Sequence, residues 1–337
     1  MQQARRSLAR VCSARRHAGG LALAMMAAVL GQGAAQAAGY PERPVRLVVA
    51  YAAGANADLT ARKVTYRLSA SLGQQIAVDN RTGASGIIGT EFAARAAPDG
   101  YTLLFGTAQA MVTNLYLFAK LPYDPIRDFS PIARIGTHPQ FFVVPLTVPV
   151  NSIKELIAYI KARPGQLNYP SSGNGTNAHL SSALFVNVAG LEVSHVPYNN
   201  PGSLIADLVN GRTQFMSYSY PPLSAMIRSG KLRVLATTGQ RRSELFPDAP
   251  TMIESGLADF VISGWEGIFA PAGTGKEVLD RVYAGVAETL KDPDIIANLK
   301  SDGGEAALAA PAEFVAFMRT EVDRYRKIIS VSGVQPQ

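Results

Sequence analysis

"VRLVVAYAAGANADLTAR", residues 45–62, is an apolar run of β-forming residues that passes through small residues into a helix start, with Asp58 at the junction. The runs 76–80 and 101–107 are also continuous and β-rich, as buried parallel strands are. Between the first two runs, apolar residues recur at helical spacing: Ala61, Val64, Leu68 and Leu72. This βαβαβ order predicts a parallel sheet wrapped by helices.

The same alternation restarts after the proline-marked segment 120–132. "FFVVP" (141–145) predicts a strand, and "SIKELIAYIKARPG" predicts a helix opened by Ser152, with Glu155 completing a capping box. Strand-like and helical segments then alternate up to residue 238, which gives a second α/β unit. Beyond residue 260 only one strand-like stretch remains, which is too little for a third sheet. We therefore expect the chain to return to the first unit.

These patterns predict two α/β lobes, lobe 1 from residues 38–142 and 259–337 and lobe 2 from 143–258. The cleft between such lobes is the natural ligand site.

Residues 1–37 are typical of a cleaved signal peptide, because five arginines and no acid precede an apolar run and "AQA". We expect cleavage after Ala37 and export to the periplasm. Without these residues, 27 basic and 25 acidic residues remain, so the formal net charge falls from +7 to +2 and gives no sign of nucleic-acid binding. The only cysteine, Cys12, lies in this segment, which argues against disulfides, thiol catalysis and thiolate metal sites.

The motifs that resemble catalytic or nucleotide sites depart from the required patterns. "TGASGIIGT" (82–90) spaces its glycines differently from a dinucleotide loop, and "APAGTGKE" (270–277) lacks the first glycine and the hydroxyl of a phosphate loop. No G-x-S-x-G occurs, and His138, His179 and His195 lack the spacing of a metal pair or a triad. We expect no catalytic residue, metal ligand or cofactor.

Five loops instead repeat one arrangement, in which a strand end is followed by small residues, a polar residue and a helix start: 53–58, 81–86, 106–110, 171–179 and 197–203. Small residues allow close approach to the backbone, and helix N-termini bind carboxylates. A simpler reading treats Asp58, Thr176 and Asn200 as N-caps only and Trp265 as a core residue. Five loops at strand ends in two lobes are better explained by one shared cleft.

The ordered motifs "YPERPVRLVVAYAAGANADLTAR", "VDNRTGASGIIGTEFAARAAPDGYTLLFGT", "LPYDPIRDF", "LNYPSSGNGTNAHL", "HVPYNNPGSLIADLVNGR", "PTMIESGL" and "GIFAPAGT" resemble the tripartite tricarboxylate transporter substrate-binding receptors, the Bug family. The resemblance covers essentially all of residues 38–337. It implies a type II periplasmic-binding-protein fold, in which two α/β lobes close over a ligand. It also implies a receptor that captures a small carboxylate and delivers it to a membrane permease. We expect this receptor to be a monomer.

Carried over by motif, the resemblance implies ligand contacts from strand-end loops of both lobes. Lobe 1 would supply Tyr51, Gly54, Ala55, Asn56, Asp58, Ala84, Ser85, Gly86, Thr107 and Gln109. Lobe 2 would supply Ser171, Ser172, Thr176, His179, Tyr198, Asn199 and Asp207.

Several positions depart from the family's usual residues. Ala53 and Ala55 flank Gly54 where Pro-Gly-Gly is usual, Asn199-Asn200 replaces Lys-Gly, and Tyr218 and Glu266 are also unusual. These changes favour a monocarboxylate or an aromatic or amide-bearing solute over a tricarboxylate. Two alternatives stay open: a cell-envelope esterase using Ser85 or Ser172, and a ligand-sensing receptor for a membrane signalling partner.

Overall fold

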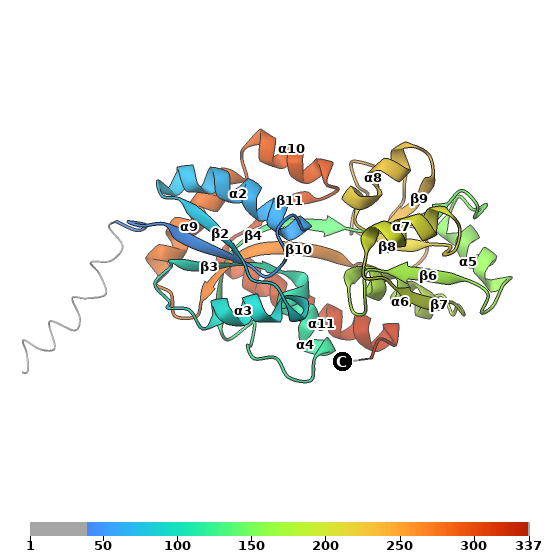
Figure 1. The fold of residues 1–337 in the computed structure, drawn as a ribbon, viewed down its shortest axis with the longest axis horizontal. Coiled ribbons are helices and arrows are strands. Elements are labelled where there is room, and N and C mark those ends of the chain that lie inside the picture. The colour runs from blue at the N-terminus through green and yellow to red at the C-terminus, as the bar shows by residue number, and fades with distance from the viewer. Residues whose placement is uncertain (1–38, 336–337) are drawn as a thin grey trace, which may run out of the picture. The chain divides into compact units, whose positions relative to one another are not determined.

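The computed structural model describes residues 39–335 (Figure 1). The chain divides into two compact units, Met1–Glu42 and Arg43–Gln337. Of the first unit only residues 39–42 are described, so the predicted signal peptide lies outside the described residues.

A six-stranded sheet has the strand order β11-β4-β10-β3-β1-β2. Its strands are β1 (Val45–Val49), β2 (Ile76–Asn80), β3 (Thr102–Thr107), β4 (Phe129–Pro139), β10 (Ser263–Pro271) and β11 (Glu305–Ala309). β1 pairs in parallel with both β2 and β3, which confirms the predicted βαβαβ unit. The helices packed on this sheet are α2 (Asn56–Leu72), α3 (Ile87–Ala94), α9 (Lys276–Thr289), α10 (Pro293–Ser301) and α11 (Pro311–Ser332). Figure 1 shows α2 and α10 on one side of the sheet and α3 and α11 on the other.

Two long central strands, β4 and β10, run side by side in antiparallel register, with Trp265 opposite Thr137. β10 is also antiparallel to β3, and β11 is antiparallel to β4. The sequence reading missed β4 and β11. Pro131, Gly136 and several polar residues interrupt the apolar pattern of β4, and the alanine-rich β11 lacks β-branched residues.

A second sheet, in the order β8-β5-β9, is formed by β8 (Met216–Tyr218), β5 (Phe141–Pro145) and β9 (Leu232–Thr237). β5 is antiparallel to both neighbours, so the prediction of a mostly parallel sheet in each lobe is wrong here. β5 follows β4 after the single residue Gln140 and runs away from the first sheet, whereas β8 and β9 run back towards it. The parallel pattern does hold for the small pair β6 (Asn168–Ser171) and β7 (Ser194–Pro197).

The helices around the second sheet are α5 (Ile153–Lys161), α6 (Asn177–Val188), α7 (Pro201–Val209) and α8 (Tyr220–Arg228). Ser152 caps α5 as predicted, because its hydroxyl accepts from the Glu155 N–H at 3.1 Å. The Glu155 carboxylate accepts from the N–H of Asn151, at 2.8 Å, instead of from Ser152. Short helical turns complete the chain at η1 (Ala84–Gly86), η2 (Gln109–Thr113) and α4 (Asn114–Leu117).

Within residues 39–335 no helix combines the length and the apolar character that spanning a bilayer requires. The assignment of residues 38–142 and 259–337 to one lobe and 143–258 to the other stays a prediction.

Candidate functional site

A cleft of about 590 Å³ opens beside the central strands. It is bordered by the ends of β1 and β3, the first turns of α2 and α8, and the region where β4 and β10 meet β5. From the first half of the chain it is lined by Tyr51, Gly54, Ala55, Asn56, Ala57, Leu59, Thr60, Lys63, Thr107, Ala108, Gln109, His138 and Pro139. From the second half it is lined by Asn177, Pro201, Tyr218, Ser219, Pro221, Pro222, Gly264, Trp265, Glu266 and Asp302.

The N-terminus of α2 faces this cleft without a cap. Ala55 is the N-cap residue, with extended backbone at φ −70° and ψ 158°, and it has no side chain that could accept from the helix. Among the described residues no acceptor is placed for the N–H groups of Asn56, Ala57 and Asp58. Free N–H groups at the positive end of a helix dipole favour an anion, carboxylates included.

Asp58 is buried behind this turn, which it supports, and it does not line the cleft. The prediction that Asp58 caps the helix is wrong, because α2 begins two residues earlier, at Asn56. Its side chain is buried, and Oδ2 accepts from the Gly54 N–H at 2.8 Å and from Arg62 Nε at 3.0 Å. Oδ1 accepts from Asn80 Nδ2 at 2.8 Å. Both carboxylate oxygens are therefore used in holding residues 54–58 in place.

The pKa of Asp58 follows from the same contacts. Burial alone would raise it, but the hydrogen bonds from Arg62, Gly54 and Asn80 outweigh burial and leave the pKa below its ordinary value. The carboxylate is charged at neutral pH.

Tyr51 and Thr107 join the ends of β1 and β3 at the cleft wall. The Tyr51 hydroxyl and Thr107 Oγ1 lie 2.8 Å apart. Burial raises the pKa of Tyr51, and the hydrogen bond with Thr107 offsets only part of the rise, so the phenol stays neutral. Gln109 also lines the cleft and donates from Nε2 to Asn114 Oδ1 at 2.8 Å. The hydroxyls of Tyr51 and Thr107 and the amide of Gln109 can therefore contact a ligand in a fixed orientation.

The predicted loop Ala84, Ser85 and Gly86 lies behind this wall and outside the cleft lining. All three residues have positive φ, at 46°, 54° and 86°. A β-carbon on Gly86 would lie 3.2 Å from the Tyr51 hydroxyl oxygen, and this tight contact together with the positive φ favours glycine here. The carbonyl of Ser85 accepts from Asn114 Nδ2 at 3.0 Å, and the loop thereby supports Tyr51 and Gln109.

None of the seven predicted residues of the second half lines the cleft. Ser171 is fully buried, with its hydroxyl 2.7 Å from Nε2 of His195. Thr176 caps α6, and Nδ1 of His179 accepts from the Gly175 N–H at 3.0 Å. Burial and the neighbouring His195, whose ring is stacked at 3.8 Å, lower the pKa of His179 to about 4.

The other four residues are also directed elsewhere. Tyr198 donates to Asp207 Oδ2 at 2.8 Å, and Asp207 Oδ1 pairs with Arg212 at 2.9 Å. Asn199 is exposed outside the lining. Ser172 also lies outside the lining, with its side chain near the hydroxyl of Tyr218, which does line the cleft.

The second half instead contributes a wall rich in proline rings, which the sequence reading missed. Pro201 opens α7, and Pro221 and Pro222 lie in the first turn of α8. Proline has no N–H, so these two helix starts have fewer donors to offer than α2. Tyr218 and Asn177 complete the wall. The run "SYSYPP" (217–222) is the sequence signal that could have indicated this wall.

The floor of the cleft carries two ion pairs. His138 on β4 lies 2.6 Å from Glu266 on β10, and Lys63 lies 3.0 Å from Asp302. No arginine is among the residues that line the cleft. Each cation in the described lining already has an acidic partner, so the free N–H groups at the uncapped start of α2 are the donors best placed for an anion.

The His138–Glu266 pair gives a pH-dependent prediction. Burial would lower the pKa of His138, but the charge and hydrogen bond of Glu266, helped by Asp302, raise it above the ordinary value. A raised folded-state pKa adds stability below the unfolded pKa of about 6.5, and this stability is lost as pH rises through the folded value. We expect Glu266→Gln to lower the unfolding free energy by roughly 1–2 kcal/mol more at pH 6 than at pH 8.5, measured by urea denaturation. An equal loss at both pH values would contradict the assignment.

The described residues give little support to the esterase alternative. Ser85 is exposed, with no histidine among its hydrogen-bond partners. The one serine–histidine contact, Ser171 with His195, is buried outside the cleft. Residues 39–335 contain no group of three or more His, Cys, Asp or Glu side chains arranged to hold a metal ion.

Two sheets are linked through the neighbouring strands β4 and β10, and a ligand-sized cleft lies beside these strands. This arrangement defines a solute-binding protein of the type II periplasmic class. Residues 60–334 match the model of the tripartite tricarboxylate transporter family receptor, and the chain belongs to this family.

Solved structures agree with the assignment. The Rpa4515 protein of R. palustris, solved with adipate, is 32% identical, with a TM-score of 0.79 over 88% of this chain and 100% of that one. The periplasmic binding protein BugD is 33% identical, with a TM-score of 0.75 over 88% and 100% of the two chains. MatC from Rhodopseudomonas palustris, with bound malate, is 29% identical, with a TM-score of 0.74 over 86% and 100%.

Proposed function

We propose that this protein captures a small carboxylate in the periplasm and delivers it to a membrane permease of the tripartite tricarboxylate type. The observation that carries the proposal is the uncapped start of α2 at the cleft, where the N–H groups of Asn56 and Ala57 await an acceptor. The ligand carboxylate binds there, and the two predicted lobes close over it by a hinge motion at β4 and β10.

The proposed ligand carries one carboxylate and an apolar or aromatic body. The related proteins solved with adipate and malate bind dicarboxylates, so similarity alone would favour two charges. In this cleft a second ligand carboxylate would be repelled by Glu266 and Asp302. The nearby cations His138 and Lys63 already pair with these two acids, so neither is free to bind it. The proline rings and Tyr218 opposite α2 suit an apolar surface, and the floor suits a hydroxyl or amide.

A thermal-shift screen tests this proposal. Monocarboxylates, aromatic acids, nicotinate-like compounds, dicarboxylates and tricarboxylates are compared, each acid beside its primary amide. A ligand at 100 times its Kd stabilises the folded state by about 2.7 kcal/mol, which corresponds to a rise of several degrees. We expect one monocarboxylate class to raise the melting temperature while its amide does not. A response to tricarboxylates alone would contradict the proposed ligand class, and a response to no acid at all would contradict the proposed function.

The signalling alternative differs in partner, not in ligand. A pull-down from membranes with ligand-loaded protein separates the two, because transport requires capture of the permease and signalling requires a different membrane protein.

A further inference from the structure

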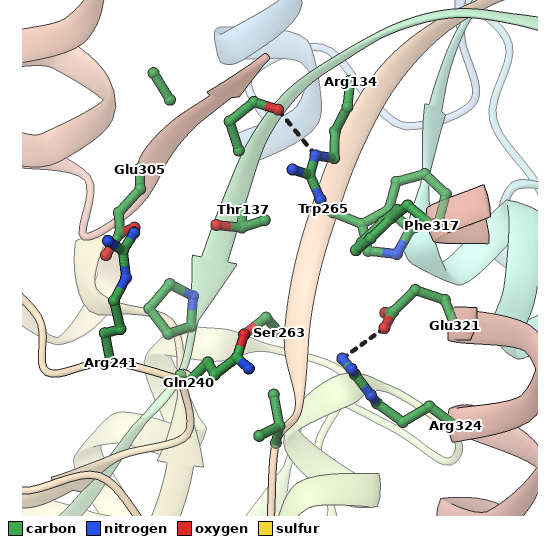
Figure 2. A pocket seen from close by; sticks show the side chains of 15 residues that line it. Arg134, Thr137, Gln240, Arg241, Ser263, Trp265, Glu305, Phe317, Glu321 and Arg324 are labelled. Atoms are coloured by element: carbon green, nitrogen blue, oxygen red, sulfur yellow. Dashed lines mark hydrogen bonds and ion pairs between the residues drawn. The ribbon is translucent and has the colours of Figure 1, made fainter. Parts of the chain in front are cut away.

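A second pocket, of about 340 Å³, is lined in part by residues of β4 and β10 (Figure 2). Successive side chains of a strand point to opposite faces. His138 and Glu266 point into the cleft, so the neighbouring Thr137 and Trp265 point mainly the other way. Helix α11 and the segment after β9 enclose this pocket with Phe317, Glu321, Arg324, Gln240 and Arg241.

Arg134 on β4 is a half-buried cation that forms no ion pair within the described residues, although the charges of Glu321 and Glu313 act on it from further away. Its Nε donates to the Ala307 carbonyl at 2.8 Å, and its guanidinium lies 4.3 Å from the centre of the Phe317 ring. Among the described residues no carboxylate lies within 4.0 Å of it. Figure 2 shows the free end of its guanidinium directed into the pocket. A guanidinium has five N–H donors, so four remain for a ligand.

The other charges of the pocket neutralise one another. Arg324 lies 2.6 Å from Glu321, and Arg241 lies 2.8 Å from Glu305. Three arginines and two glutamates therefore line the pocket, and Glu313, outside the lining, also acts on Arg134. Within the lining the arginines exceed the glutamates by one, which favours a single negative charge.

Trp265 carries a second donor at this pocket. Its side chain is only 1% exposed, and its indole N–H makes no hydrogen bond of normal length and angle. The Glu321 carboxylate is nevertheless close: burial raises the pKa of Glu321, and the charge of Arg324 and the indole N–H offset part of that rise. A buried N–H without a well-placed acceptor costs about 1–3 kcal/mol. A ligand oxygen in the pocket would give this N–H a better-placed acceptor.

We propose that this pocket is a second ligand site, for a small monocarboxylate. Arg134 and the Trp265 indole N–H donate to the ligand oxygens. Phe317 and the alanines Ala306 and Ala307 contact its short apolar part. This site is separate from the proposed cleft function and neither requires nor excludes it.

Trp265 is the only tryptophan and lines this pocket, so its fluorescence responds to a ligand bound there. The probe is acetate, added at constant ionic strength, with acetamide as the neutral molecule of the same shape. We expect a saturable change with acetate and none with acetamide. Arg134→Gln should weaken the acetate response at least tenfold, whereas Arg134→Lys, which keeps the charge, should retain it within severalfold.

Arg163→Gln is the matched control. Arg163 also lies over an aromatic ring, 4.0 Å from the centre of Tyr159, and donates to a backbone carbonyl at 3.1 Å, but it lines neither pocket. Trp265 also touches the cleft, so Asn56→Pro, aimed at the cleft, must leave the acetate response unchanged. The proposal is overturned if Arg134→Gln binds acetate normally, if Arg134→Lys loses the response, if acetamide acts equally, or if Asn56→Pro abolishes the response.

Discussion

Asp58→Ala is expected to weaken binding of the carboxylate ligand by about 100-fold, equivalent to about 2.7 kcal/mol. The substitution removes the acceptor that holds the Gly54 N–H at 2.8 Å and Asn80 Nδ2 at 2.8 Å, so the turn before α2 loses its fixed geometry. The buried donors left unpaired should also lower the unfolding free energy by about 2 kcal/mol. Calorimetry with the ligand from the screen and urea denaturation measure the two effects.

Two control variants separate the turn from the ion pair. Arg62 is half-exposed, and Arg62→Gln removes its charge while leaving the other contacts of Asp58 in place, so affinity should fall less than threefold. Ser85→Ala tests the predicted contact of Ser85, whose hydroxyl lies outside the cleft lining. Unchanged affinity in Asp58→Ala would show that the ligand does not use the start of α2.

Asn56→Pro is expected to weaken binding by 10- to 100-fold with little change in stability. Proline is tolerated at the first position of a helix, and Ala55, at φ −70° and ψ 158°, already has the extended backbone that a following proline requires. The substitution removes one N–H from the proposed carboxylate site and also changes the side chain.

Asn56→Ala is the matched control, because it removes the same side chain and keeps the N–H. Calorimetry should show a clearly larger loss for the proline variant than for the alanine variant. Equal losses would assign the contact to the Asn56 side chain instead of the backbone.

The parts of the fold set by local pattern were predictable from sequence. The run 45–49 and the helix after it show their period and small-residue turn directly, and parallel pairing with β2 and β3 followed. β4 was missed because the polar residues Arg134, Thr137 and His138 alternate between two faces that both carry pockets. A strand with two functional faces lacks the apolar pattern on which a strand prediction depends.

The predicted site residues of the first half of the chain fall into two groups, those that line the cleft and those that support its wall. Tyr51, Gly54, Ala55, Asn56, Thr107 and Gln109 all line the cleft. The sequence predicts ligand contacts for Asp58 and Gly86 because both lie in strand-end loops. In the structure Asp58 instead holds the Gly54 N–H, and Gly86 packs against Tyr51, so both residues support the cleft wall. His138 and Glu266 are separated by 128 residues, so only strand pairing could reveal their contact.

The most direct test of the central claim is a crystal structure of the protein with the acid that gives the largest thermal shift. We predict that a ligand carboxylate oxygen lies about 3 Å from the backbone nitrogens of Asn56 and Ala57, with the apolar part against Tyr218 and the proline wall. A ligand carboxylate directed to the second half of the chain, with no contact to the start of α2, would contradict this account.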